Sequence, residues 1–139
     1  MRLITLMTLL IAITWMMSSH QDTVKSDDQG EIIAIPAHEE KIDGLIYDHF
    51  SRSPLFCLYN TKTDSCVFIK NTLSTASQGG SRRVVQLLSS NGVNKIYLVK
   101  AGDNAMEFLS NSGIKTEIVP SGKSIRQILD MKSNEEEEE

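Results

Sequence analysis

Between residues 81 and 132 the sequence alternates between helical and strand patterns, and this alternation limits the folds open to the chain. Strands that are joined through helices lie parallel, because the helix returns the chain to the edge at which the first strand began. Helical patterns cover residues 81–92, 103–113 and 121–132, and apolar runs typical of strands cover residues 94–101 and 114–119. The second half of the chain therefore predicts parallel strands covered by helices.

The ends of these helical patterns carry the usual start and stop residues. Ser81 and either Asp103 or Asn104 are the expected N-caps, because their side-chain oxygens can accept hydrogen bonds from first-turn N–H groups. Gly92 and Gly113 are the expected stops, since glycine readily adopts the left-handed conformation that ends many helices.

The first half of the domain adds three strands to this arrangement. Residues 31–37 form a buried apolar run that Pro36 is expected to end. Residues 55–60 and 66–71 are β-rich runs with a short polar connection, which predicts an antiparallel hairpin. We therefore expect a single α/β domain with a mixed five-stranded sheet, helices on both faces and the order β-β-β-α-β-α-β-α. This order resembles the ribonuclease H-like fold.

The composition predicts one domain followed by an acidic tail. A chain of 139 residues with 40% hydrophobic and 23% charged residues can bury the core of one globular domain. Its formal net charge is −4, but residues 135–139 are five glutamates, so the rest of the chain carries a charge of +1. Such a domain lacks the basic surface typical of nucleic-acid binding. We expect residues 132–139 to be a disordered acidic tail.

An uncharged apolar run covers residues 3–17, directly after Arg2. Such a run is typical of secretory signals, and it is short for a membrane span, which needs about 18 apolar residues or more. We expect residues 1–30 to be a signal or anchor segment with a polar linker. The protein would then be membrane-anchored or exported, with membrane contact only through residues 3–17. Two alternatives stay open, a misassigned start codon before a cytoplasmic protein and a buried core helix.

No residue pattern in the chain indicates catalysis. Nucleases of the ribonuclease H-like fold need a carboxylate inside the first strand, and residues 32–36 contain none. The G-x-S-x-G motif of a nucleophilic serine is also missing. We expect Cys57 and Cys66 to be thiols that pack as small apolar residues. The sequence therefore predicts a protein that is not an enzyme.

Two glycine-bearing turns before predicted helices indicate a binding edge. Gly79 and Gly80 precede a helix that opens with Arg82 and Arg83, and Gly102 precedes the next helix. Free N–H groups and the helix dipole attract anions to a helix start. Both turns would lie at the carboxyl edge of the sheet, where ligands of open α/β sheets bind. The alternative is that the glycines only let the loop turn while the arginines face water.

The stretch "HFSRSP", residues 49–54, carries two further candidates. The neutral imidazole of His49 can ligate iron, zinc or copper, and the guanidinium of Arg52 can pair with a carboxylate or phosphate through two hydrogen bonds. We expect Phe50 to pack inward and Pro54 to restrict the chain before the next strand. The alternative is that His49 only shapes a turn.

This hexapeptide, together with "IIAIPA" and "VVQLLSSNGVNKIYLV", resembles the dinitrogenase iron–molybdenum cofactor biosynthesis domain family over residues 31–131. The family's motif reads H-F-G-R-A-P, so Ser51 and Ser53 stand where it has glycine and alanine. Members have a ribonuclease H-like α/β fold, and several bind or carry iron–molybdenum or related metal clusters during nitrogenase assembly.

The resemblance implies a non-enzymatic binding or carrier domain for a metal-containing cofactor or an anionic ligand. It implies a cluster of the iron–molybdenum or iron–sulfur type, and partners among the proteins of metal-cluster assembly. We expect the cofactor to bind at His49, Arg52, Gly79, Gly80 and Gly102, with His49 as the metal ligand. The alternative function is a membrane-tethered or exported interaction module that retains no cofactor.

Overall fold

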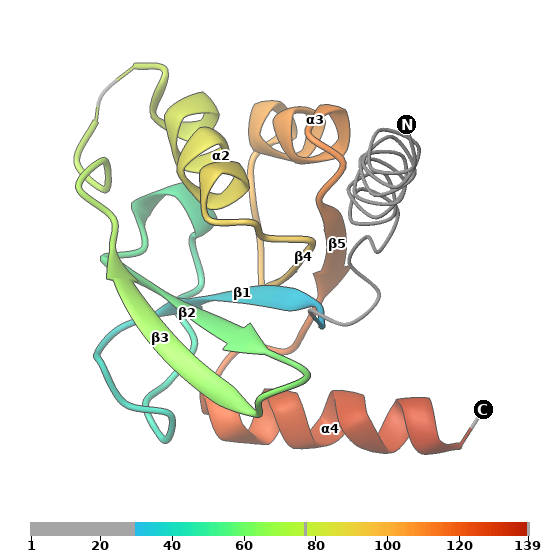
Figure 1. Cartoon of the computed structure of the whole chain (residues 1–139). Coiled ribbons are helices and arrows are strands. Elements are labelled where there is room, and N and C mark those ends of the chain that lie inside the picture. The colour runs from blue at the N-terminus through green and yellow to red at the C-terminus, as the bar shows by residue number, and fades with distance from the viewer. Residues whose placement is uncertain (1–29, 77, 139) are drawn as a thin grey trace, which may run out of the picture. The chain divides into compact units, whose positions relative to one another are not determined.

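The chain folds with the predicted order of strands and helices. The computed structural model describes residues 30–76 and 78–138. The predicted α/β fold is confirmed, with small shifts of the element boundaries (Figure 1). The elements are β1 (Ile32–Ala37), the 3-10 turn η1 (Phe50–Arg52), β2 (Leu55–Asn60), β3 (Ser65–Lys70), α2 (Gly80–Ser90), β4 (Lys95–Leu98), α3 (Asp103–Asn111), β5 (Lys115–Ile118) and α4 (Ile125–Glu137).

The five strands form one mixed sheet in the order β3-β2-β1-β4-β5. β1 pairs antiparallel with β2 and parallel with β4, so it lies where the two halves of the sheet meet. β2 and β3 form the predicted hairpin, because their short connection only allows antiparallel pairing. β4 and β5 are parallel, as the helix between them requires.

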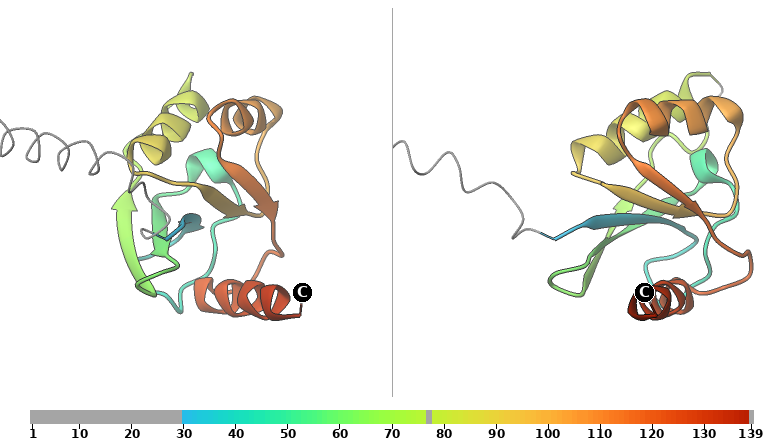
Figure 2. Two further views of the ribbon diagram at one scale, coloured as in Figure 1. Left: turned by 45° about the vertical axis from the view of Figure 1, so that its right-hand side comes forward. Right: turned by 90° about the vertical axis from the view of Figure 1, so that its right-hand side faces the viewer.

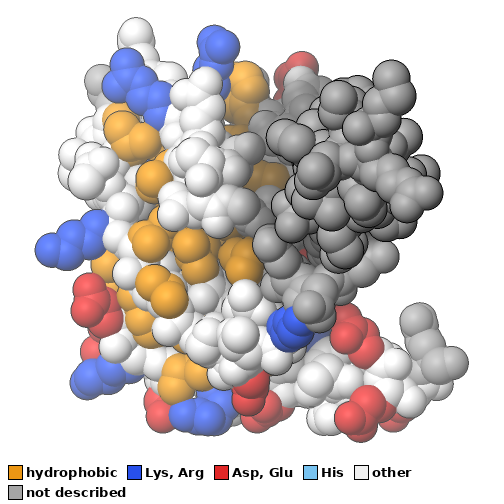
Figure 3. Space-filling model, viewed as in Figure 1, with side chains coloured by type: hydrophobic (Ala, Val, Ile, Leu, Met, Phe, Trp, Pro, Cys, Tyr) orange, Lys and Arg blue, Asp and Glu red, His pale blue; other side chains and the backbone are white. Residues whose placement is uncertain are grey.

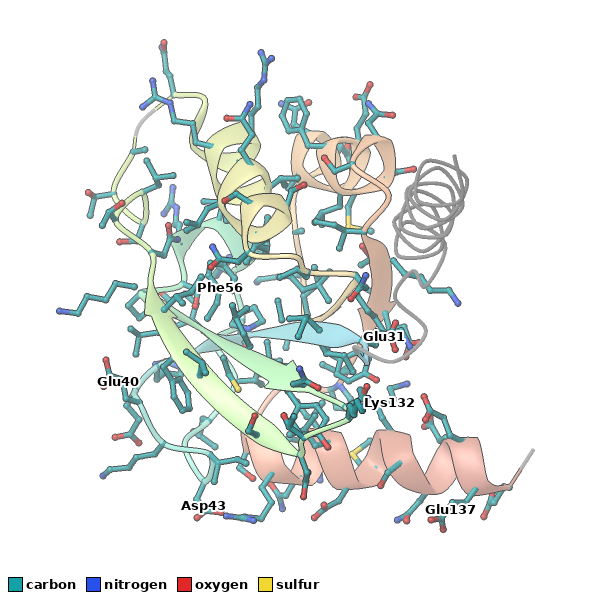
Figure 4. All side chains as sticks on the ribbon, in the orientation of Figure 1. Glu31, Glu40, Asp43, Phe56, Lys132 and Glu137 are labelled. Carbon is teal, nitrogen blue, oxygen red and sulfur yellow. The ribbon has the colours of Figure 1, made fainter. Side chains whose placement is uncertain are left out.

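Helices cover both faces of this sheet, as predicted. α2 and α3 lie on one face and α4 lies on the other (Figure 2). The side chains of β1 alternate between the two layers: Ala34 packs with α2 and α3, whereas Ile33 and Ile35 pack with α4. Phe56 lies on the α2 side of the sheet, where it is fully buried (Figure 4). A strand buried on both faces explains why β1 reads as a continuous apolar run.

The acidic C-terminus differs from the expectation, since α4 continues to Glu137 where we predicted disorder from residue 132. The Nζ atom of Lys132 lies 3.1 Å from Glu117 on β5 and 2.9 Å from Glu135 one turn further along α4. It also lies 5.9 Å from the ring centroid of Tyr97, on the side of α4 that faces the sheet (Figure 4). These contacts hold α4 to the sheet at Lys132 and pair one glutamate of the tail with a lysine, so like charge in the tail does not prevent the helix.

The predicted signal or anchor segment falls outside the described residues, except for Gly30. In residues 30–76 and 78–138, no helix has both the length and the apolar character needed to cross a membrane.

The two cysteines are free thiols on neighbouring strands of the hairpin. Cys57 is buried, and it pairs across the ladder with Phe68, while Cys66 pairs with Tyr59. Burial, together with the nearby Cys66, raises the pKa of the Cys57 thiol. A buried thiol that resists ionisation is a poor nucleophile, which agrees with a packing role.

Candidate functional site

The chain between β1 and β2 returns to the sheet and lies beside the carboxyl ends of β1 and β4. The N–H of Tyr47 donates to the carbonyl of Pro36 at the end of β1, at 2.9 Å. On the other side, the backbone N–H of Lys100 donates to the carbonyl of Asp48 (3.2 Å), and the carbonyl of Lys100 accepts from the backbone N–H of Phe50 (3.2 Å). His49 thereby pairs with Lys100 as a short parallel bridge after β4. This is the place where connections leave β1 and β4 in opposite directions, and such positions bind ligands in open α/β sheets.

The η1 turn follows immediately, with its phenylalanine buried and an exposed polar residue on each side of that phenylalanine. Phe50 is 1% exposed, and its ring centroid lies 5.7 Å from that of Phe56 in the core. This inward packing was predicted, and it fixes the turn. His49 and Arg52, on either side of the buried ring, are both exposed.

Two adjoining pockets bring the five predicted site residues together. The first, of about 380 Å³, is lined by His49, Phe50, Ser51, Arg52, Lys100, Ala101 and Gly102. The second, of about 340 Å³, is lined by Ser51, Arg52, Leu73, Ser74, Ala76, Gly79, Gly80, Ser81, Arg82, Asn104 and Phe108. The two pockets share Ser51 and Arg52, so Arg52 stands at the boundary between them.

The start of α2 presents uncapped backbone to the second pocket. Gly79 is the N-cap, so no side chain accepts a hydrogen bond from the first turn, and Ser81, which we expected to cap the helix, lies inside it. Gly79 has φ +68°, a left-handed conformation that most side chains disfavour. A Cβ atom on Gly80 would lie 3.3 Å from the Cβ atom of Ala76, which is tight. The glycines therefore shape this turn and leave N–H groups available to an anion.

Gly102 is placed differently. It is the N-cap of α3, in place of the expected Asp103 or Asn104, and it has ordinary extended backbone angles. A Cβ atom there would meet no atom within 4 Å. Gly102 therefore leaves space in the first pocket, and the backbone does not require glycine at this position.

The charge around the two pockets is positive. Arg52, Arg82 and Lys100 line them and are exposed, and the lining includes no carboxylate. Among the described residues none of these three cations forms an ion pair. Lys and Arg side chains gather over the start of α2, at the top of the face seen in Figure 3. The site therefore suits an anion.

Metal ligands are few at this edge. Within residues 30–76 and 78–138, no three His, Cys, Asp or Glu side chains are close enough to hold a metal ion together. His49 contributes the single imidazole among the residues lining the two pockets. His38 lies in a neighbouring pocket, where its ring centroid is 4.7 Å from that of Tyr47.

Lys100 lines the first pocket, but the sequence analysis did not name it as a site residue. It lies at the end of the predicted strand of residues 94–101, whose carboxyl end we expected at the binding edge, so its position was a usable signal. Ser51 was also missed, although it lies between the two predicted residues His49 and Arg52.

Comparison with known proteins places the chain in a family. The family model described as dinitrogenase iron-molybdenum cofactor matches residues 31–134. The apo form of the orange protein from Desulfovibrio gigas shares the fold, with a TM-score of 0.73 and 24% sequence identity over 78% of this chain and 91% of that protein. A NifB-like protein of the DUF35 family from Thermotoga gives a TM-score of 0.67 and 28% identity over 75% of this chain and 88% of that one. No curated protein matches the sequence. Because the family model covers most of the chain, the protein belongs to the dinitrogenase iron-molybdenum cofactor family.

Proposed function

We propose that this chain is a non-enzymatic binding or carrier domain for a metal-containing anionic cofactor, a cluster of the iron–molybdenum or iron–sulfur type. Residues 31–131 would carry the site, and proteins of metal-cluster assembly would be its partners. The observation that supports this most is the pair of joined cationic pockets around Arg52. The description of the matching family supports the nature of the cargo.

The donor set fits an anionic cluster that is held mainly by charge. Arg52, Arg82 and Lys100 would supply positive charge, and the N–H groups near Gly79 and Gly80 would donate hydrogen bonds. His49 would supply the metal bond from its imidazole. Gly102 would leave room for the cargo beside it.

The absence of thiolate donors from the lining favours a carrier over a permanent holder. Cys57 and the half-buried Cys66 pack on the α4 face of the sheet, and neither lines the two pockets. Thiolates are the ligands that iron–sulfur units prefer, so a site with one imidazole holds such a unit reversibly. Release to a partner would break one metal–protein bond and a set of charge contacts.

The proposal is tested by loading the full chain under anaerobic conditions with isolated iron–molybdenum cofactor, followed by gel filtration. We expect molybdenum and iron to elute with the wild-type protein and to be reduced in His49→Ala. His38→Ala is the matched control, since that histidine lines neither pocket, and it should retain the metals. Wild-type protein that elutes free of metal would overturn the proposal and would leave the interaction module as the better account.

A further inference from the structure

Buried polar side chains are rare in the described part of the chain, and two of them lie directly behind the candidate site without lining its pockets. The buried polar or charged residues there are Ser53, Asn71 and Lys95, at 0%, 4% and 7% exposure. Lys95 lies 3.6 Å from each of two glutamates, Glu31 and Glu117, away from the two pockets. Ser53 instead directly follows Arg52 and bonds to Ala37 and Leu55, and the Asn71 side chain bonds to the two residues that flank Arg52.

The side chain of Asn71 joins the η1 turn to the glycine-bearing loop. Its Nδ2 atom donates to the carbonyl of Ser51 at 3.2 Å and to the carbonyl of Ser53 at 2.8 Å, the two residues that flank Arg52. Its Oδ1 atom accepts from the N–H of Leu73 at 3.1 Å. The backbone N–H of Asn71 adds a bond to the carbonyl of Pro54 at 2.9 Å. The second pocket has one wall formed by the η1 turn with Ser51 and Arg52, and another formed by the loop that begins at Leu73. The amide nitrogen of Asn71 bonds to the first wall and its amide oxygen bonds to the second.

We propose that Asn71 is a positioning residue, which fixes the turn carrying Arg52 against the loop that leads to Gly79 and α2. The effect of Asn71 on ligand binding rests on the proposed function. Its effect on the structure, which is to hold the turn and the loop together, does not depend on any ligand. An amide can hold both walls because it donates on one side and accepts on the other. Side chains that orient ligand-binding groups in this way typically change affinity 10- to 100-fold when removed.

The test compares Asn71→Ala and Asn71→Asp with a matched control in the full chain. Asn71→Asp keeps an acceptor for Leu73 but replaces the two donors that face carbonyl oxygens. Asn94→Ala is the control, because the Asn94 side chain also accepts from a backbone N–H, that of Ile32 at 2.8 Å, outside both pockets. Affinity for isolated iron–molybdenum cofactor is measured where each variant is folded, and backbone amide exchange is measured by NMR without ligand.

We expect both Asn71 variants to bind the cofactor about 10- to 100-fold more weakly than wild type, and the Asn94 control to bind within about twofold. In Asn71→Ala, amide exchange should accelerate roughly tenfold or more at Leu73 and Ser53, while α3 and β5 keep their protection. An unchanged affinity in either Asn71 variant, or an unchanged exchange rate at both amides, would overturn the inference. If wild-type protein fails to bind, the proposed function is wrong, and the exchange rates alone decide whether Asn71 couples the two walls.

Discussion

Replacing Ser53 with alanine tests whether the hexapeptide turn is held by its buried hydroxyl. The Ser53 side chain is fully buried, and its Oγ atom accepts from the N–H of Ala37 at 3.1 Å at the end of β1. The same hydroxyl donates to the carbonyl of Leu55 at 2.6 Å, where β2 begins. One small side chain therefore links the ends of two strands to the turn between them.

The size of the effect follows from these two bonds. Ser53→Ala removes the hydroxyl to which the buried N–H of Ala37 donates. Loss of a hydrogen-bond partner by a buried donor costs about 1–3 kcal/mol, and the carbonyl of Leu55 loses a bond as well. We therefore expect the free energy of unfolding to fall by about 2 kcal/mol.

Urea unfolding of the full chain, followed by circular dichroism, measures this change. The midpoint should move to lower urea while the slope stays constant, because the surface exposed on unfolding is nearly the same. Ser90→Ala is the matched control: its hydroxyl also bonds a backbone carbonyl, that of Leu87 at 2.9 Å, but at an exposed position, so its effect should stay within about 0.5 kcal/mol. Equal midpoints for Ser53→Ala and wild type would refute the reasoning.

Three further predictions follow from other parts of the fold. Phe50→Ala should lower the free energy of unfolding by about 3–5 kcal/mol in the same urea assay, since its ring is buried; a loss near zero would show that the turn is not anchored by this side chain. The pKa of Tyr59 is raised to about 12 by its hydrogen bond to Asp64, and Asp64→Asn should return it toward 10 in a phenolate absorbance titration; an unmoved titration would contradict the assignment. The pKa of Glu117 is below its ordinary value of 4.5: burial opposes ionisation, but hydrogen bonds and charge from lysines, chiefly Lys132, outweigh it. The stability that this carboxylate adds is present above pH 4.5 and is lost as the pH falls through its lowered pKa, so the thermal midpoints of wild type and Glu117→Gln should converge on acidification, and a constant difference would count against it.

The order of the elements could be predicted because its signals are local. The pattern of residues 55–60 matches β2 in full, and Gly92 ends its helix with φ +76°, as glycine at such a stop often does. The candidate site could be placed for the same reason, since Gly79 and Gly102 lie in turns at the carboxyl ends of predicted strands.

Helix boundaries were predicted less well, because several neighbouring residues can serve as caps. Ser81 and Asp103 each lie inside the helix they were expected to cap. The start of α4 did carry a readable signal: Ser124 and Gln127 form a capping box, in which each side chain accepts from the other's backbone N–H.

Contacts between distant segments could not be predicted from local patterns. The return of the chain beside β1 and β4 depends on backbone hydrogen bonds from Tyr47 to Pro36 and from Lys100 to Asp48, and the second of these joins segments far apart in the sequence. The position of Asn71 depends in the same way on carbonyls 18 and 20 residues earlier in the chain. These bonds bring Lys100 to the site and make Asn71 part of its support.

The central claim, that the carboxyl edge around Arg52 binds an anionic metal cofactor, is tested most directly by an NMR titration of the full chain with isolated iron–molybdenum cofactor. We expect the amide signals of Ser51, Arg52, Gly79, Gly80 and Gly102 to shift or broaden first, while those at the opposite edge, near the start of β1, change little. In Arg52→Ala the same changes should require about tenfold more cofactor or more, because a charged hydrogen-bonding partner is lost. Changes centred on the opposite edge, or no changes at all, would contradict the account.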